Sequence, residues 1–200
     1  MKKHRTFVSC LLALLSLPAI GLALEIGDSL PSAGTKMKNV DNRELTLKEI
    51  KGEKGTLVVF SCNACPYSQA WESRIIDLAK TAQAKNIGVA MVNSNDPKVV
   101  AEDSFEMMQK RAKEKDYSFP YLFDATSNVA REYGAARTPE VFLFDANDKL
   151  TYHGAVDDNA HEPKKVQKRY LLEALNAIET GKPIPENVTK AIGCTIKFRS

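Results

Sequence analysis

The chain has 200 residues, of which 44% are hydrophobic and 26% are charged, a length and composition typical of one globular domain with some additional sequence. The formal net charge of +3 falls to 3 − 3 = 0 without residues 1–23, which carry three basic and no acidic side chains. A surface without net charge does not attract nucleic acid or an anionic membrane, so both are excluded as expected partners.

Residues 1–23 have the pattern of a secretory signal peptide. Three basic residues precede the apolar stretch 7–22, and the small residues at 21–23 are typical of a cleavage site. We expect cleavage there and a periplasmic or secreted protein with no stable membrane association. An uncleaved membrane anchor is the alternative, because residues 7–24 approach the length needed to span a bilayer.

The rest of the chain is predicted to alternate strands and helices. The unbroken apolar run 56–60 is typical of a strand buried on both faces, and the spacing of Trp71, Ile75, Leu78 and Ala82 indicates a long helix after it. A second apolar strand at 87–92 follows that helix, which predicts a βαβ unit with parallel strands. We expect further strands at 119–123, 140–144 and 150–153, and helices at 45–50, 103–115, 127–133 and 166–178.

Three details refine this pattern. Asp103 and Glu106 resemble a capping box at the start of a helix. The turn 145–148 predicts an antiparallel hairpin between the last two strands. The apolar residues near the end predict that residues 181–200 form a tail docked on a domain of residues 24–180.

Two cysteines lie at the junction between the buried strand and the long helix. Cys62 and Cys65 are separated by two residues, and this spacing after a buried strand is typical of a redox dithiol. The start of a helix stabilises a thiolate, so we expect Cys62 to be the nucleophile and Cys65 to resolve the mixed disulfide. Pro66 is tolerated in the first turn, where its missing N–H costs nothing.

The Thr138–Pro139 bond precedes a predicted strand far along the chain. Only a bond before proline readily adopts the cis form, so we expect a cis bend that faces the dithiol and offers the Thr138 backbone to an extended substrate. Arg137 is expected either to add positive potential near the dithiol or to form a surface salt bridge. For Cys194 three roles stay open: a third redox thiol, a bond between subunits, or a buried structural residue, the role we favour.

These features together resemble the thioredoxin superfamily, and specifically its redoxin branch of peroxiredoxin-like and TlpA-like exported proteins. The resemblance runs from residue 26 to about residue 178 and rests on the dithiol with its strand, the segment 105–115, Thr138–Pro139 and the hairpin. It implies an α/β thioredoxin fold, a mixed central sheet flanked by helices, with an N-terminal extension and an inserted helix and strand.

The family resemblance implies a thiol-disulfide oxidoreductase that acts on protein or small-molecule thiols and disulfides with a redox partner still to be found, and it implies no cofactor. Peroxiredoxins carry Pro-x-x-x-Thr/Ser-x-x-Cys, but counting back from Cys65 places Cys62 at the hydroxyl position and Val58 at the proline position. The peroxiredoxin pattern is therefore incomplete, and a thiol peroxidase is the alternative to the oxidoreductase.

Two further expectations follow from departures from the family. No acidic residue lies in the strand before the dithiol, so Glu140 or water is expected to move the proton of Cys65, although Glu140 also suits a plain hydrogen-bonded role. A non-catalytic module that binds a partner or copper is a third alternative. We expect no metal site, and we interpret His153 as a polar residue on an edge strand.

Overall fold

The computed structural model describes residues 23–200. Its strands are β1 (Met37–Asn39), β2 (Glu44–Leu45), β3 (Gly55–Phe60), β4 (Ile87–Asn93), β5 (Tyr121–Phe123), β6 (Arg137–Thr138), β7 (Glu140–Asp145), β8 (Leu150–Gly154) and β9 (Cys194–Thr195). Its helices are α1 (Leu47–Ile50), α2 (Pro66–Ala84), α3 (Phe105–Glu114), α4 (Asn128–Tyr133) and α5 (Tyr170–Thr180), with 3-10 turns at Ala101–Asp103 and Pro163–Lys165.

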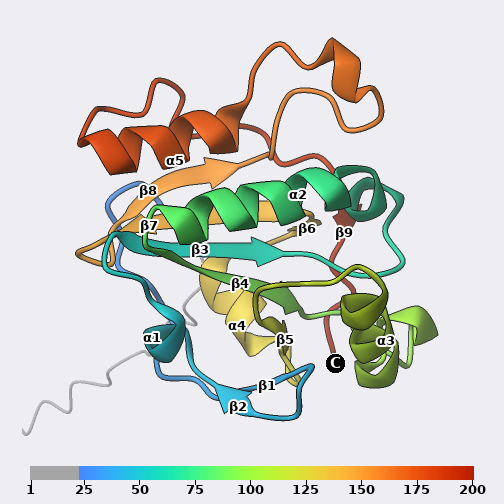
Figure 1. The fold of residues 1–200 in the computed structure, drawn as a ribbon. Coiled ribbons are helices and arrows are strands. Elements are labelled where there is room, and N and C mark those ends of the chain that lie inside the picture. Colours follow the sequence, from blue (N-terminus) through green and yellow to red (C-terminus); the bar gives the residue numbers. More distant parts are fainter. Residues whose placement is uncertain (1–22) are drawn as a thin grey trace, which may run out of the picture.

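The central sheet is mixed. Strands β2, β1, β5 and β4 follow one another in that order, as do β3, β7 and β8. Strands β4 and β5 are parallel, whereas β3 pairs with β7 and β7 with β8 in antiparallel fashion. Strand β4 runs beside β3 in the same direction (Figure 1), and Ser61 N donates to Val92 O across 2.9 Å at the end of β3. The predicted βαβ unit and the hairpin are both confirmed.

Helices cover both faces of the sheet (Figure 1). Leu57 and Val59 pack in one core cluster with residues of α2 and α5. Val58 and Phe60 pack in a second cluster with residues of α1 and α4. Because successive side chains of a strand point to opposite faces, every residue of β3 is buried, and the dithiol directly after it is held by a rigid strand.

Helix α1 begins at Leu47 rather than at residue 45, and three other helices also begin later than the sequence predicts. Helix α2 starts at Pro66, because Cys65 has an extended backbone and serves as N-cap. Helix α3 starts at Phe105 with Ser104 as N-cap, so the predicted capping box of Asp103 and Glu106 is wrong. Helix α5 starts at Tyr170, after a 3-10 turn and an extended segment.

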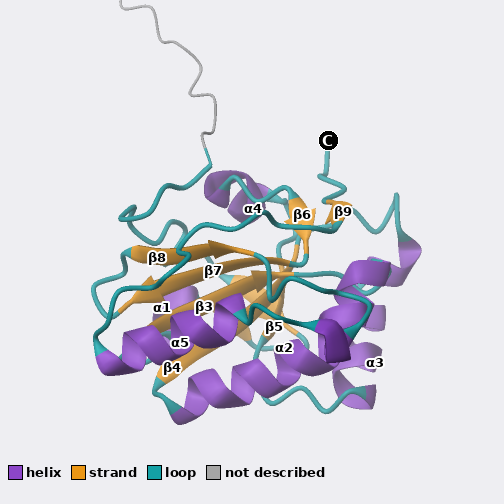
Figure 2. Ribbon diagram, turned by 90° about the horizontal axis from the view of Figure 1, so that it is seen from above, coloured by secondary structure: helices purple, strands orange, loops and turns teal. Residues whose placement is uncertain are grey.

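The segment 181–200 lies against the rest of the molecule at two places. Near β8, His153 N donates to Asn187 O and Thr189 N donates to His153 O. Further on, β9 pairs antiparallel with β6, so that the chain end runs beside the strand that precedes Pro139 (Figure 2). The Ile196 side chain is buried in the second core cluster.

Between residues 23 and 200 there is no helix long and apolar enough to cross a membrane. The predicted signal peptide, or the alternative anchor, falls almost entirely outside the residues that the structure describes and stays a prediction.

Candidate active site

The two cysteines of the dithiol are buried side by side against Thr138. Their residues are 5% and 3% exposed, respectively, and both sulfurs carry free thiols. Cys62 Sγ lies 3.4 Å from Thr138 Oγ1, and Cys65 Sγ lies 2.9 Å from Thr138 O, to which its thiol donates when protonated. The Thr138–Pro139 peptide bond is cis, as its sequence predicts. The bend therefore does face the dithiol.

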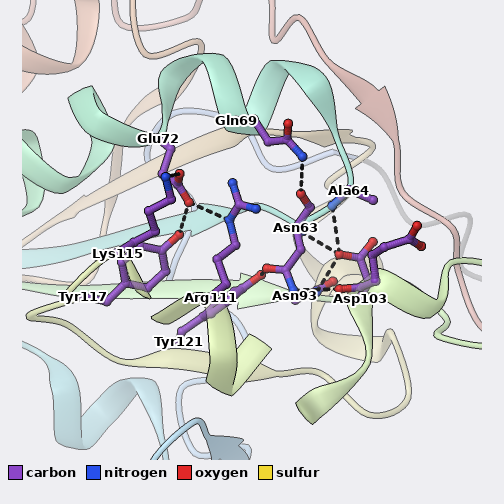
Figure 3. A network of polar contacts seen from close by, with 11 residues as sticks. Asn63, Ala64, Gln69, Glu72, Asn93, Asp103, Arg111, Lys115, Tyr117 and Tyr121 are labelled. Atoms are coloured by element: carbon purple, nitrogen blue, oxygen red, sulfur yellow. Dashed lines mark hydrogen bonds and ion pairs between the residues drawn. The ribbon is translucent and has the colours of Figure 1, made fainter. Parts of the chain in front are cut away.

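A buried carboxylate organises the loop between the cysteines (Figure 3). Asp103 is completely buried, and its Oδ1 accepts hydrogen bonds from Asn63 N at 2.6 Å and from Ala64 N at 3.4 Å. Asn95 Nδ2 donates to its other oxygen at 2.7 Å, and Asn93 Nδ2 lies 3.3 Å from Oδ1. The backbone N–H groups that follow Cys62 are thus directed at a carboxylate rather than at a thiolate.

The pKa values of the two thiols shift in opposite directions, and the contact of Cys65 with Thr138 O opposes the shift of Cys65 because it stabilises the protonated form. The hydrogen bond that the Cys62 thiol donates to Cys65, together with burial and the charge of Asp103, raises the pKa of Cys62. The same hydrogen bond lowers the pKa of Cys65 against the opposing effect of burial, and the backbone N–H of Ser68 at the start of α2 lowers it further. The predicted helix start at Cys62 is wrong, because α2 begins at Pro66 with Cys65 as its N-cap. The helix dipole therefore acts more closely on Cys65 than on Cys62.

A third thiol lies beside the pair. Cys194 in β9 is the direct partner of Thr138 in β6, and its side chain contributes to the lowered pKa of Cys65. Burial and the hydrogen bond to Cys65 raise the pKa of Cys194, while the charges of Lys197 and Arg137 oppose this effect. Residues 194–195 also occupy the edge of β6 at which the sequence predicts a bound substrate.

Glu140 forms hydrogen bonds with the loop before Pro139 and with His153. Its Oε2 accepts hydrogen bonds from Ala136 N and Arg137 N, both at 2.8 Å, and its Oε1 lies 2.7 Å from His153 Nε2. The plain hydrogen-bonded role therefore fits Glu140, which anchors the loop before Pro139. Arg137 is exposed, and its charge acts on Cys194.

Residues 25–169 match the Redoxin family model. The chain belongs to the Redoxin family. No curated protein matches it significantly. This redoxin is 35% identical to an uncharacterized conserved protein from Geobacillus kaustophilus, whose structure superposes with a TM-score of 0.81 over 88% of this chain and 93% of that one. It is 31% identical to a hypothetical protein from Sinorhizobium meliloti 1021, with a TM-score of 0.82 over 90% of this chain and 97% of that one.

A third structure identifies the fold of this redoxin. The thioredoxin domain of a thiol-disulfide oxidoreductase from Bacteroides vulgatus is 18% identical, with a TM-score of 0.55 over 66% of this chain and 89% of that one. The predicted thioredoxin fold is therefore confirmed. Membership of the Redoxin family supports a thiol redox role.

The residue of this redoxin's site that sequence reasoning missed is Asp103. The run Asn93-Ser94-Asn95-Asp96 directly after a buried strand was the available signal, because polar side chains at the end of a central strand need partners. Asn93 and Asn95 both bind Asp103. Among residues 23–200, no group of three or more His, Cys, Asp or Glu side chains is arranged to hold a metal ion.

Proposed function

We propose that this redoxin is an exported thiol-disulfide oxidoreductase that cycles Cys62 and Cys65 between a dithiol and a disulfide. The observation that carries the proposal is the placement of two buried thiols against the same residue, Thr138, and the pKa of Cys65 is lowered while that of Cys62 is raised. A pair in which one sulfur is ionised and its neighbour holds a proton is prepared for disulfide exchange. Cleavage after residue 23 predicts that the intact mass of the exported protein equals that of a chain beginning at Leu24.

The exchange is written with Cys65 as the attacking group. Its thiolate attacks one sulfur of a substrate disulfide, the substrate S–S bond breaks, and the departing thiolate takes a proton from solvent. Cys62 then loses its proton and attacks Cys65 Sγ, which forms the Cys62–Cys65 disulfide and releases the second substrate thiolate. The substrate gains two electrons and the pair loses two. The reverse sequence oxidises a substrate dithiol.

Thr138 and Asp103 position the two sulfurs for this exchange. The Thr138 hydroxyl contacts Cys62 and its carbonyl oxygen contacts Cys65, so the same residue fixes both side chains. Asp103 holds the loop through Asn63 N and disfavours a negative charge on Cys62. Cys62 therefore keeps its proton, and with it the hydrogen bond to Cys65, until the mixed disulfide has formed.

A thiol peroxidase is the second candidate, and the lowered pKa of Cys65 at the start of α2 favours it. In that reaction the Cys65 thiolate attacks a peroxide oxygen, the O–O bond breaks to give an alcohol or water, and Cys65 becomes a sulfenic acid. Cys62 then condenses with it, which forms the disulfide and releases water.

Stopped-flow mixing of the reduced protein with either a disulfide-bonded protein or hydrogen peroxide separates the two candidates. We expect the Cys62–Cys65 disulfide to form with the protein disulfide at a rate that is first order in that substrate. With peroxide, we expect oxidation no faster than that of the thiolate of a small reference thiol. Rapid saturable oxidation by peroxide, together with no exchange with the protein disulfide, would contradict the oxidoreductase and support the peroxidase.

A further inference from the structure

The end of the chain occupies the surface of β6 that a substrate would need. Strand β9 pairs with β6 in register, Thr138 opposite Cys194 and Arg137 opposite Thr195, and Ile196 N donates to Ala136 O at 3.0 Å. Gly193 lies so close to the bend that a Cβ on it would be 2.1 Å from Thr138 O. Only glycine permits this approach, so the position of Cys194 depends on a glycine directly before it.

Thr138 brings three sulfurs together. Its hydroxyl contacts Cys62 and its carbonyl oxygen contacts Cys65. Directly opposite residues of an antiparallel pair place their side chains on the same face, so Cys194 projects to the face on which Thr138 contacts Cys62. Cys65 also raises the pKa of Cys194, so the two sulfurs are close enough to interact. The third thiol is therefore beside the sulfur that carries the thiolate.

The tail and the dithiol loop share a buried anchor. Lys197 N donates to Asn95 Oδ1 at 2.8 Å, and Asn95 Nδ2 donates to Asp103 Oδ2 at 2.7 Å. The other oxygen of Asp103 holds Asn63 N between the two cysteines. The Asn95 side chain thus links the tail backbone to the carboxylate of Asp103 through two hydrogen bonds. The segment that carries Cys194 is therefore fixed relative to the two cysteines of the dithiol.

Cys194 is the most exposed of the three cysteines. Cys62 and Cys65 are buried, whereas Cys194 is half-buried and lies near the charges of Arg137 and Lys197. When Cys65 is in a disulfide, the hydrogen bond and charge by which it raises the pKa of Cys194 are lost, whereas the two cations still favour a Cys194 thiolate. Cys194 is also the sulfur that a partner can reach while β9 stays in place.

We propose that Cys194 is a third catalytic thiol that passes the disulfide between the buried pair and an external substrate. The Cys194 thiolate attacks Cys65 Sγ in the Cys62–Cys65 disulfide; the Cys65–Cys194 bond forms, and Cys62 leaves and takes up the proton that Cys194 lost. A substrate thiolate then attacks Cys194 Sγ, and Cys65 leaves as a thiolate. A second substrate thiolate then attacks the substrate sulfur that is bonded to Cys194, which forms the substrate disulfide and releases Cys194 as a thiolate. Three reduced cysteines and a substrate oxidised by two electrons remain. This inference rests on the proposed function.

The Cys62→Ser variant tests the proposal, because serine retains a hydroxyl beside Cys65 but cannot form the buried disulfide. After oxidation by glutathione disulfide, we expect peptide mapping without reductant to find Cys65 bonded to Cys194. Adding Gly193→Ala or Ile196→Ala, which keep all remaining thiols but disturb the docking of β9, should slow the formation of this bond by up to about 100-fold. A Cys62→Ser protein in which Cys65 and Cys194 carry only separate glutathione adducts would overturn the proposal.

Wild-type protein in the same buffers distinguishes this failure from failure of the proposed function. A wild type that forms the Cys62–Cys65 disulfide, with a Cys62→Ser variant that forms no Cys65–Cys194 bond, contradicts only the role of Cys194. A wild type that forms no reversible disulfide contradicts the proposed function itself. We also expect Cys194→Ser to leave the Cys62–Cys65 equilibrium with glutathione in place but to slow reduction of that disulfide by a protein dithiol, and an unchanged rate would count against the relay.

Discussion

Replacing Asp103 with asparagine is expected to lower the free energy of unfolding by about 1–3 kcal/mol, the cost of leaving a buried polar group without a partner. One carboxylate oxygen becomes an amino group that faces the amino group of Asn95, which now donates to it at 2.7 Å. Rotation of the Asn95 amide would relieve this conflict but would remove the acceptor of Lys197 N. One buried hydrogen bond is lost either way. Urea unfolding of the reduced protein measures the difference.

The neighbouring Glu102→Gln variant is the matched control, because Glu102 is an exposed acid in the same turn. We expect this change to alter stability by no more than about 0.5 kcal/mol, the usual range for a surface substitution. The same Asp103→Asn protein should also ionise Cys62 at lower pH than the wild type, because the charge that raises the pKa of Cys62 is gone. Equal stability of the two variants would contradict the central position of Asp103.

The second large effect is a difference in thiol pKa between two variants of the mature protein, each of which keeps only one cysteine, Cys65 or Cys62. With Cys194→Ser in both backgrounds, we expect the thiol of the Cys62→Ser variant to stay reactive toward iodoacetamide at pH values well below about 8.5, the ordinary pKa of cysteine. A lowered pKa keeps Cys65 ionised as the pH falls, until the pH passes that pKa. The serine hydroxyl can replace the hydrogen bond that the Cys62 thiol donates.

The Cys65→Ser variant should behave in the opposite way. Burial and the charge of Asp103 continue to raise the pKa of Cys62, so its alkylation should become fast only at alkaline pH. The pH dependence of the alkylation rate of each variant, with glutathione as the reference thiol, measures both effects. A lower apparent pKa for Cys62 than for Cys65 would restore Cys62 as the nucleophile and contradict the assignment made from the structure.

The parts of the molecule that were predictable have a local cause. An apolar run such as 56–60 marks a buried strand, and a proline before a strand marks a bend, so both the dithiol and Thr138–Pro139 could be located from the sequence. The N-cap position of Cys65 could have been predicted from the sequence, because Pro66 is well suited to the first helical position. The sequence instead predicts the helix start, and with it the thiolate, at Cys62, whereas the structure has the N-cap at Cys65.

The other parts depend on contacts between distant segments. Asp103 was interpreted as a helix cap because Glu106 follows three residues later, but its carboxylate binds a loop 40 residues earlier in the chain. The pairing of Thr138 with Cys194 joins residues 56 positions apart, and two-residue strands such as β6 and β9 have no periodicity to detect. The sequence left a third redox thiol open as one of three roles for Cys194, but the occupied substrate edge and the place of Cys194 opposite Thr138 came only from the structure.

The central claim is that Cys62 and Cys65 form a reversible disulfide. The protein is equilibrated in glutathione buffers that cover a wide range of reduced to oxidised ratios, its free thiols are alkylated, and each cysteine is identified by peptide mass. We expect Cys62 and Cys65 to lose and regain their alkylation together in one two-electron transition, at the same midpoint from either direction. A protein in which both cysteines stay alkylated at every ratio, or in which they form only separate glutathione adducts, would contradict the claim.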